Sequence, residues 1–554
     1  MSMRVRFYRT LIIAVFAAAA HLQDPSVVSA QDVPVWGRFE AAFTAARDYD
    51  NPLYDVPRFA VHFTSATGRK KTLNAFWDGG RSWKVRFMPD EPGAWTYVTE
   101  VKATDAAGLH DLRGNFLATQ NANAKFDLYR RGALRHPKGT YYLAHADGAP
   151  FFWAACTAWN GALKSTNDEW DRYLSDRVRN GYSVIQLVTT QWRGQDVDEN
   201  GDAAFEGAGR IRINARFFQR LDRKMDRINE HGLVAAPVLL WALQQSSNRE
   251  LSPGYFLPDP EAILLARYMV ARYGAHHVLW LLGGDGKYNN EYEQRWKSIG
   301  RGVFGTNDYQ GVVATHSQGK SWIGREYAGE RWLEVIGYQS GHNAEPVTVQ
   351  WITKGPVSED WAHLPPRPLI NMEPVYEQSG RGTITPQNVR NASYWSVFSA
   401  PVSGITYGAN AIWPWSRSAD EPIFGHGNRP AGMTWEQSLK LPGSLQVGYL
   451  ANFLRRFEWW ALRPAPELLV EQPGEREARL FISALATGDG RLVLVYFPAA
   501  TTARLANPFG RSYAAEWFDP VANGSRPAGV LGPDGILQVS PPFAEDAVLV
   551  LRLK

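Results

Sequence analysis

The sequence predicts an α/β protein: a (β/α)8 barrel of the TIM type, flanked by an N-terminal β-sandwich and a small C-terminal all-β domain. Short alternating strands occupy residues 36–125, strands then alternate with helix-length segments up to about residue 460, and short strands return after the proline-rich Arg463-Pro-Ala-Pro466. With 45% hydrophobic and 21% charged residues, the composition is that of a folded globular chain. We expect domain boundaries near residues 31–125, 126–460 and 461–554.

Residues 1–30 have the pattern of an export signal. Three arginines precede the apolar run 11–20, and Val28-Ser29-Ala30 fits a small-residue cleavage site. The run is shorter than the roughly 20 apolar residues that span a bilayer, so a membrane anchor is the less favoured alternative. We expect cleavage near Ala30 and a periplasmic or secreted protein without stable membrane insertion.

The predicted N-terminal sandwich rests on four alternating runs separated by turn residues. Asp78-Gly79-Gly80 is typical of a hairpin turn between two of them. The runs cover residues 58–63, 72–77, 83–87 and 93–98.

The predicted barrel rests on a count of eight apolar, β-rich runs, each followed by a helix-length segment. One helix begins with the capping box Thr166-x-x-Glu169 and ends at Gly181, and another runs from Asn214 to Gly232. The eight runs cover residues 151–156, 184–188, 234–241, 278–282, 311–314, 335–338, 369–372 and 404–407.

The last helix of the barrel is expected over residues 434–457. Beyond it, strands are expected at 478–482, 492–497 and 547–551.

The ends of the eight runs carry aromatic, amide and acidic side chains. In barrels of this kind the functional residues lie at the carboxyl ends of the strands. Tryptophan faces stack on sugar rings while amides and histidines bond hydroxyl groups, so these residues predict a carbohydrate pocket. They are Trp159, Asn160, Gln191, Trp192, Trp241, Asp285, His316, Gln339, Glu373 and Trp413.

Asp285 and Glu373 are the candidate catalytic residues, because they end the fourth and seventh runs, which lie on opposite sides of an eight-stranded ring. Two carboxyl groups facing each other across a sugar are the minimum apparatus of glycoside hydrolysis. The structural alternative is that either acid forms an ion pair or hydrogen bonds only. Glu377, one turn further on, is a weaker competitor for Glu373.

The chain also resembles the apiosidase-like family of glycoside hydrolases. The resemblance lies in Leu134-Arg-His-Pro-Lys-Gly-Thr-Tyr-Tyr-Leu143, Trp153-Ala-Ala-Cys-Thr-Ala-Trp159, Trp280-Leu-Leu-Gly-Gly-Asp285 and Asn371-Met-Glu-Pro-Val-Tyr-Glu377. It implies a retaining barrel, with Asp285 as acid/base, Glu373 as nucleophile and Tyr376 in the substrate site. The characterised family activity removes apiose from plant pectic side chains.

The flanking regions extend this resemblance over nearly the whole chain. Tyr49-Asp-Asn-Pro-Leu-Tyr54 and Phe76-Trp-Asp-Gly-Gly80 are similar to the small β-sandwich often fused before the barrel. Tyr496-Phe-Pro498 and Trp517-Phe-Asp-Pro520 resemble a collagen-binding-like β-domain, for which sugar binding or packing alone is an equal expectation.

Other signals are weak or point to structural roles. The formal charge of +4 and the absence of a long Lys/Arg cluster argue against a nucleic-acid partner or another polyanion-binding surface. No cofactor or metal is expected. The acidic loop 196–202 lacks the final bidentate glutamate of a calcium loop, so a solvated turn is expected there. His276-His277 is expected to be a structural pair, and Cys156 is expected to be a core thiol.

The predicted function is therefore an exported retaining glycosidase acting on plant or microbial polysaccharide. Two alternatives remain open: a non-catalytic carbohydrate- or matrix-binding protein that uses the barrel as a scaffold, and a barrel hydrolase of another bond such as an amide. The oligomeric state cannot be predicted from these patterns.

Overall fold

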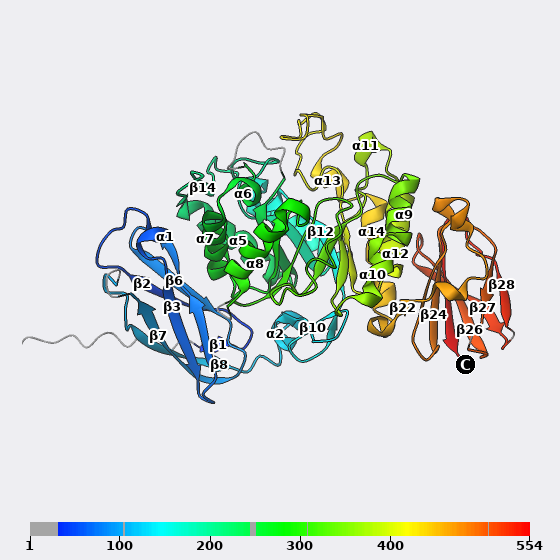
Figure 1. Ribbon diagram of the computed structural model, residues 1–554, viewed down its shortest axis with the longest axis horizontal. Helices are drawn as coiled ribbons and strands as arrows, with labels where there is room; N and C mark the ends of the chain where they lie inside the picture. Colours follow the sequence, from blue (N-terminus) through cyan, green and yellow to red (C-terminus); the bar gives the residue numbers. More distant parts are fainter. Residues whose placement is uncertain (1–31, 103–105, 244–250, 307–308, 508, 534) are drawn as a thin grey trace, which may run out of the picture.

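The computed structural model describes residues 32–554 except 103–105, 244–250, 307–308, 508 and 534, so the predicted export signal lies outside the described residues. Figure 1 shows an N-terminal β-rich region, a central α/β region and a C-terminal β region side by side along the long axis. Among the described residues, no helix combines the length and apolar character needed to cross a membrane.

The N-terminal region contains two sheets that enclose an aromatic core. Phe39 stacks on Phe116 at 4.0 Å and Phe63 on Phe87 at 4.3 Å between ring centroids. The five-stranded sheet has the order β1-β8-β7-β3-β4 and the three-stranded sheet β2-β6-β5. In chain order the strands are β1 (Asp32–Pro34), β2 (Phe39–Thr44), β3 (Phe59–Ser65), β4 (Lys70–Asn74), β5 (Phe76–Gly79), β6 (Ser82–Phe87), β7 (Gly93–Val101) and β8 (Arg113–Thr119).

One predicted strand of this region is divided. The run 72–77 contributes to both β4 and β5, which belong to different sheets, because the chain crosses between the sheets at Ala75. The predicted glycine turn is present between β5 and β6, with Gly79 at φ 107° and Gly80 at φ 53°.

The central region is a mixed α/β structure built on parallel strands, as predicted. Six strands form one sheet in the order β18-β17-β16-β13-β12-β21, and β19 pairs with β20. Single parallel bridges, Ala314–Val335 and Glu377–Ala409, connect the two sets. Each of the eight predicted runs overlaps one of these strands: β12 (Trp153–Thr157), β13 (Val184–Val188), β16 (Val234–Trp241), β17 (Leu279–Gly284), β18 (Val312–Ala314), β19 (Ile336–Gln339), β20 (Leu369–Glu373) and β21 (Gly404–Tyr407).

The helices of the central region begin largely where the sequence indicates. Thr166 and Glu169 form the predicted capping box, and the Asn214 side chain accepts hydrogen bonds from two backbone N–H groups. The longer helices are α4 (Asn167–Arg179), α5 (Ala215–Glu230), α7 (Asp259–Tyr273), α8 (Glu293–Phe304), α9 (Pro346–Lys354), α12 (Pro386–Phe398) and α14 (Pro442–Leu454). Short helices are α1 (Pro52–Asp55), α2 (Asp127–Arg131), α3 (Gly161–Lys164), α6 (Pro253–Phe256), α10 (Pro356–Asp360), α11 (Ser379–Gly382) and α13 (Trp435–Ser438).

The prediction of one continuous helix over 434–457 was wrong. The segment consists of α13 and α14, separated by an extended Leu441. Pro442 explains the break, because proline disfavours a helical conformation in the preceding residue and is itself favourable at the first position of a new helix.

The C-terminal region contains a six-stranded sheet, β22-β23-β24-β29-β26-β27, and the pair β25-β28. Its strands are β22 (Arg463–Pro464), β23 (Ser483–Ala486), β24 (Leu492–Phe497), β25 (Ala503–Ala506), β26 (Tyr513–Asp519), β27 (Gly524–Leu531), β28 (Ile536–Val539) and β29 (Ala547–Leu553). The strand predicted at 478–482 is wrong, because residues 478–480 form a 3-10 turn and the strand starts at Ser483.

One face of this C-terminal sheet packs on the central region. Tyr496 stacks on Tyr394 of α12 at 4.4 Å, and Phe518 on Phe453 of α14 at 4.2 Å between ring centroids. Both pairs belong to the same buried core as the parallel strands. The C-terminal sheet therefore completes the hydrophobic core of the central region.

Candidate active site

A cavity of about 330 Å³ opens at the carboxyl ends of the parallel strands. It contains both predicted catalytic acids and five of the predicted substrate residues: Trp159, Trp192, Trp241, Tyr376 and Trp413. Residues from seven of the eight strand ends or their following loops therefore converge on one hollow, as the fold predicts.

Asp285 directly follows β17 and adopts a left-handed backbone conformation, with φ 53°. The two preceding glycines are required by packing. A Cβ atom on Gly283 would lie 2.5 Å from the Trp296 ring, and one on Gly284 would lie 2.4 Å from the Trp241 ring. The strand end thus brings Asp285 close to the aromatic wall of the cavity.

The Asp285 carboxyl group accepts a hydrogen bond from the Gln339 side-chain amide. Its removal from bulk water, followed by the negative charge of Glu373, raises the pKa of Asp285. The environment of this carboxyl group therefore favours its protonated form more than water does.

Glu373, the last residue of β20, is buried among proton donors. The Tyr376 hydroxyl donates to Oε1 at 2.6 Å, His342 Nε2 lies 3.3 Å from Oε1, and His316 Nε2 lies 3.3 Å from Oε2. Burial alone would raise the pKa of Glu373. The hydrogen bond and charge of His342, the charge of His316 and the Tyr376 hydroxyl outweigh it and lower the pKa to about 2.

The two acids lie close together, and their pKa values are shifted in opposite directions. One oxygen of each carboxyl and one His316 ring nitrogen are all within 4.8 Å of one another. Paired carboxyl groups whose environments push their pKa values apart are typical of an acid and a nucleophile or base. The pair can donate a proton and attack at the same time.

Among the described residues, Asp285, His316 and Glu373 are also the only group whose ligand atoms could hold a metal ion. Gln339 and Tyr376 already donate hydrogen bonds to the two acids. These donors bond one oxygen of each acid, whereas the buried Glu373 Oε2 has no hydrogen-bond partner among the described residues and lies 3.3 Å from His316 Nε2.

Tryptophan rings form one wall of the cavity. Trp241 lies 4.2 Å from Trp192 and 5.9 Å from Trp159 between ring centroids. Trp159 Nε1 donates to the Tyr376 hydroxyl at 2.8 Å, so the aromatic wall also orients the group that bonds Glu373. The wall offers the apolar surface on which a sugar ring can stack.

The four remaining predicted residues do not line the cavity. His316 and Gln339 lie behind the acids and contact them. Asn160 donates to the Gly194 and Pro414 carbonyls and accepts from Trp192 Nε1. Gln191 bonds Phe205 O and Ala204 N. Both amides hold the loops that carry the aromatic wall.

Several lining residues were missed by sequence reasoning. Arg193 and Asn410 follow closely on predicted strands and could have been found by extending the search by a few residues. His342 lies three residues after β19 and could have been found in the same way. Ser379 and Gly380 belong to the short helix α11, and His426 and Arg429 lie in an irregular loop without a periodic signal. The missed residues are Arg193, His342, Ser379, Gly380, Asn410, His426 and Arg429.

Glu377 lies outside the cavity. It is fully buried, accepts hydrogen bonds from the Tyr407 hydroxyl at 2.7 Å and from Gly443 N at 3.1 Å, and thus stabilises the start of α14. Burial raises its pKa. This acid has a structural role.

The weaker motifs also have structural partners. In the acidic loop 196–202, Arg220 forms ion pairs with Asp198 and Asp202, where a calcium ion would have to bind. His276 contacts Asp226 at 2.8 Å, consistent with a structural histidine. Cys156 is a buried core thiol, as expected.

Comparison with known proteins identifies two family matches along the chain. The family described as "Apiosidase-like, catalytic domain" matches residues 137–461, and a "Domain of unknown function (DUF5060)" matches residues 32–102. No curated protein sequence matches the chain.

Solved structures share the fold at low sequence identity. One described as a glycoside hydrolase has a TM-score of 0.66 and 21% identity, covering 78% of this chain and 99% of its own. A glycoside hydrolase family 5 protein from Bacteroides vulgatus ATCC 8482 has the same TM-score and identity, covering 78% and 95%. A second protein from that organism, named provisionally as a glycoside hydrolase, has a TM-score of 0.69 and 18% identity, covering 94% and 100%.

Proposed function

Because the chain belongs to the apiosidase-like family of glycoside hydrolases, we propose that it is an exported, retaining O-glycosidase of plant or microbial polysaccharide. We further propose that its eight parallel strands act as a closed (β/α)8 barrel. The two single bridges between the six-stranded sheet and the β19–β20 pair support closure.

The catalytic proposal rests on one observation: the pKa values of two adjacent acids are shifted in opposite directions. Asp285 is held toward its protonated form, while Glu373 has a pKa of about 2 and is ionised. Their oxygens lie within 4.8 Å. This separation supports retention, for which carboxyl groups are about 5–5.5 Å apart, over the ~6.5–9.5 Å that admits an inverting water.

In the proposed mechanism, Asp285 donates its proton to the glycosidic oxygen as the bond to the leaving group breaks. Glu373 attacks the anomeric carbon from the opposite face and forms a glycosyl-enzyme ester. Asp285, now ionised, removes a proton from water, which attacks the anomeric carbon and releases Glu373. Tyr376 and His342 keep Glu373 ionised before attack and stabilise it again as it leaves.

The family name supports apiose as the first sugar to test, and the tryptophan wall supports a carbohydrate over an amide substrate. A binding protein without catalysis could use the same wall. It would not require two adjacent carboxyl groups with opposed pKa shifts.

The test is a screen of the purified protein against aryl glycosides of pentoses and apiose, with NMR detection of the first-formed anomer. We expect hydrolysis with retained configuration and its complete loss in Glu373→Ala. An inverted product would contradict the retaining mechanism, and full activity of Glu373→Ala would contradict the site. Export is tested separately by N-terminal sequencing of secreted protein, which should begin near Gln31.

A further inference from the structure

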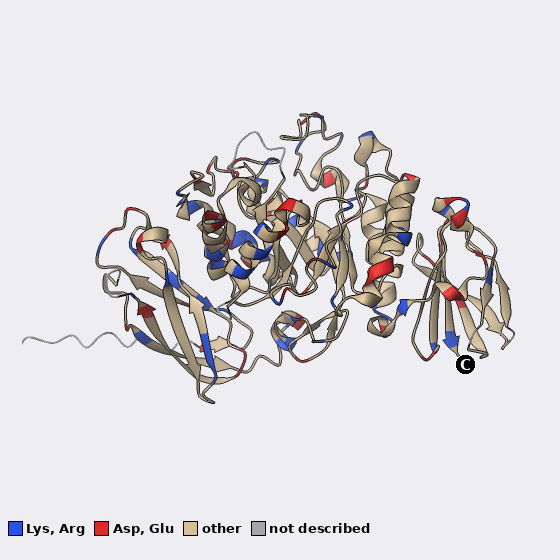
Figure 2. Cartoon of the chain, in the orientation of Figure 1, with Lys and Arg blue, Asp and Glu red and all other residues tan. Residues whose placement is uncertain are grey.

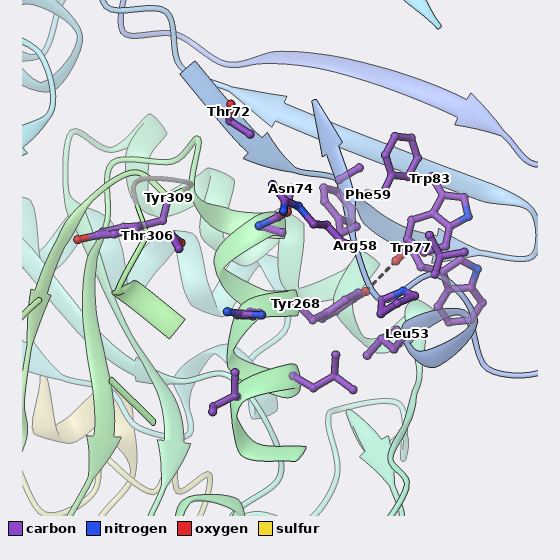
Figure 3. Close-up of a pocket in the computed structure, with 18 of the residues that line it drawn as sticks. Leu53, Arg58, Phe59, Thr72, Asn74, Trp77, Trp83, Tyr268, Thr306 and Tyr309 are labelled. Carbon is purple, nitrogen blue, oxygen red and sulfur yellow. Dashed lines mark hydrogen bonds between the residues drawn. The ribbon is translucent and has the colours of Figure 1, made fainter. Parts of the chain in front are cut away.

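A second cavity, of about 1090 Å³, lies between the N-terminal strands and the barrel helix α7 (Figure 3). One side is formed by the loop before β3 and by β3, β4 and β5. The other is formed by α7 and the residues that precede β18. The groove shares no lining residue with the candidate active site. It therefore requires a separate explanation.

Positive charge gathers in this groove. Arg58, Lys70 and Arg267 are exposed, and none of them forms an ion pair among the described residues, whereas Lys71 lies 3.7 Å from Asp90. Basic segments lie both on the N-terminal strands and on the central helices in Figure 2. Three uncompensated cations at one hollow create a positive potential that favours an anionic ligand.

Glu334 is the single acidic residue among the described residues that line the groove. Burial raises its pKa to about 7, with a backbone hydrogen bond from Val313 opposing the shift. Below that pH its charge is largely neutralised. The acid therefore offsets little of the positive potential in mildly acidic solution.

The groove also carries aromatic and polar groups suited to sugars. Figure 3 shows Trp77, Trp83 and Leu53 at one end, Tyr309 and Thr306 at the other, and Asn74 and Arg58 between them. Trp77 is half-buried, and its indole N–H donates to Gly80 O at 2.8 Å. The Tyr268 hydroxyl donates to the Trp77 carbonyl at 3.0 Å, which fixes this end of the groove to α7.

We propose that this groove binds a segment of an acidic, uronate-bearing polysaccharide and so anchors polymer to the protein outside the candidate active site. The proposal rests on the proposed glycosidase function. Carboxylates along the sugar chain can bond the exposed Arg58, Lys70 and Arg267, and the half-buried Trp77 offers a ring on which a sugar can stack. The near-neutral total charge gave no indication of this surface, because the basic residues are separated in sequence and meet only through the contact of two regions.

The test compares binding of polygalacturonate with binding of its fully methyl-esterified form by affinity electrophoresis and calorimetry. The triple variant Arg58→Ala, Lys70→Ala, Arg267→Ala should bind polygalacturonate about tenfold more weakly, as expected for loss of several exposed charge contacts. The matched control removes three exposed cations elsewhere that form no ion pair within the described part of the chain: Lys440→Ala, Arg476→Ala, Arg511→Ala. It should change binding less than twofold.

Both triple variants should keep wild-type kcat/KM on a small aryl glycoside, since none of these residues lines the catalytic cavity. The groove assignment would be overturned if the wild type bound the methyl ester as tightly as polygalacturonate, or if the control variant lost as much affinity as the groove variant. Tighter binding of duplex DNA than of polygalacturonate would also overturn it. If the wild type binds polygalacturonate in a charge-dependent way but does not hydrolyse any aryl glycoside, the glycosidase proposal is overturned instead.

Discussion

Asp285 and Glu373 each end a parallel strand, but their neighbours give them different chemistry. Asp285 has one amide donor and the nearby charge of Glu373, whereas Glu373 has a hydroxyl and two imidazoles. A carboxyl group with many proton donors is stabilised as the anion. The roles that we propose for the two acids thus rest on the side chains around them.

We predict that Asp285→Ala retains more activity on a dinitrophenyl glycoside than on a glycoside with a poor leaving group. Without the acid, the enzyme depends on the leaving group to depart unprotonated. Added azide should restore turnover and give a glycosyl azide of retained configuration, measured by NMR. Glu373→Ala is the control, and its activity should depend on neither leaving group nor azide. Equal loss on both substrates in Asp285→Ala would argue against the acid/base role.

We predict that Tyr376→Phe shifts the acidic limb of the kcat/KM profile to higher pH. The hydroxyl donates to Glu373 and helps to lower its pKa to about 2, so its removal raises that pKa. Activity requires the ionised form and is therefore lost at a higher pH as the solution is acidified. A roughly 10- to 100-fold lower kcat/KM is expected for loss of a hydrogen bond to a charged group.

Tyr407→Phe is the matched control for this profile, because its hydroxyl bonds Glu377 outside the cavity. It should leave the acidic limb in place. An unchanged limb in Tyr376→Phe would show that the two histidines alone keep Glu373 ionised.

At the scale of elements, β17 shows how a strand end becomes a catalytic position. Gly283 and Gly284 allow the Trp296 and Trp241 rings to pack against the strand backbone. The chain then turns sharply at Asp285, which has a positive φ. The two glycines therefore couple the aromatic wall to the position of the acid.

We predict that Gly284→Ala lowers kcat/KM at least tenfold while the protein remains folded. The new methyl group would lie 2.4 Å from Trp241, so the ring or the strand must move, at a typical cost of about 1–3 kcal/mol. The measurements are aryl glycoside kinetics and the melting temperature. Gly488→Ala is the control, because nothing lies within 4 Å of its added Cβ. Wild-type kinetics for Gly284→Ala would contradict the coupling.

The elements were more predictable than the loops. Apolar runs located all eight parallel strands, and their ends located both acids, because a buried parallel strand must be apolar throughout and its boundary is visible as a change in composition. His426 and Arg429 lie well beyond β21 in an irregular loop. Only the three-dimensional path of that loop brings them to the cavity.

At the scale of the whole molecule, buried and half-buried ion pairs join the N-terminal sandwich to the central α/β region. Arg86 of β6 contacts Asp222 of α5 at 2.7 Å, and Arg38 pairs with Asp226 of the same helix. Burial alone would raise the pKa of both aspartates. Arg86 and Arg272 beside Asp222, and His276 and Arg38 beside Asp226, instead lower it.

We predict that this interface loses stability below about pH 4. A carboxyl group whose pKa is lower in the folded than in the unfolded state stabilises the fold. The contribution is fully present at a pH above the unfolded-state pKa, which is near 3.9 for aspartate. It is lost as the pH falls toward the folded-state pKa. The melting temperature of Asp222→Asn should accordingly depend less on pH between 3 and 7 than that of the wild type. The exposed Asp50→Asn is the control. Parallel curves for wild type and Asp222→Asn would contradict the prediction.

The C-terminal sheet gives the last prediction, because it shares a core with the central α/β region but contributes no described residue to the candidate active-site cavity. A chain ending at Arg463 would expose Tyr394 and Phe453, which the sheet covers. It would also leave the buried Arg390 guanidinium without Asp546, and removing one partner of a buried ion pair costs about 3–5 kcal/mol.

We therefore expect the truncated chain to lack a cooperative unfolding transition, measured by calorimetry and near-ultraviolet circular dichroism. In the full chain, Tyr496→Ala should lower the unfolding free energy by about 3–5 kcal/mol, because it removes a buried aromatic ring and its hydrogen bonds to Asn391 and Asp546. Its kcat/KM on a small aryl glycoside should match the wild type below the melting transition. A soluble truncated chain with a sharp transition and full activity would show that the barrel folds without the sheet.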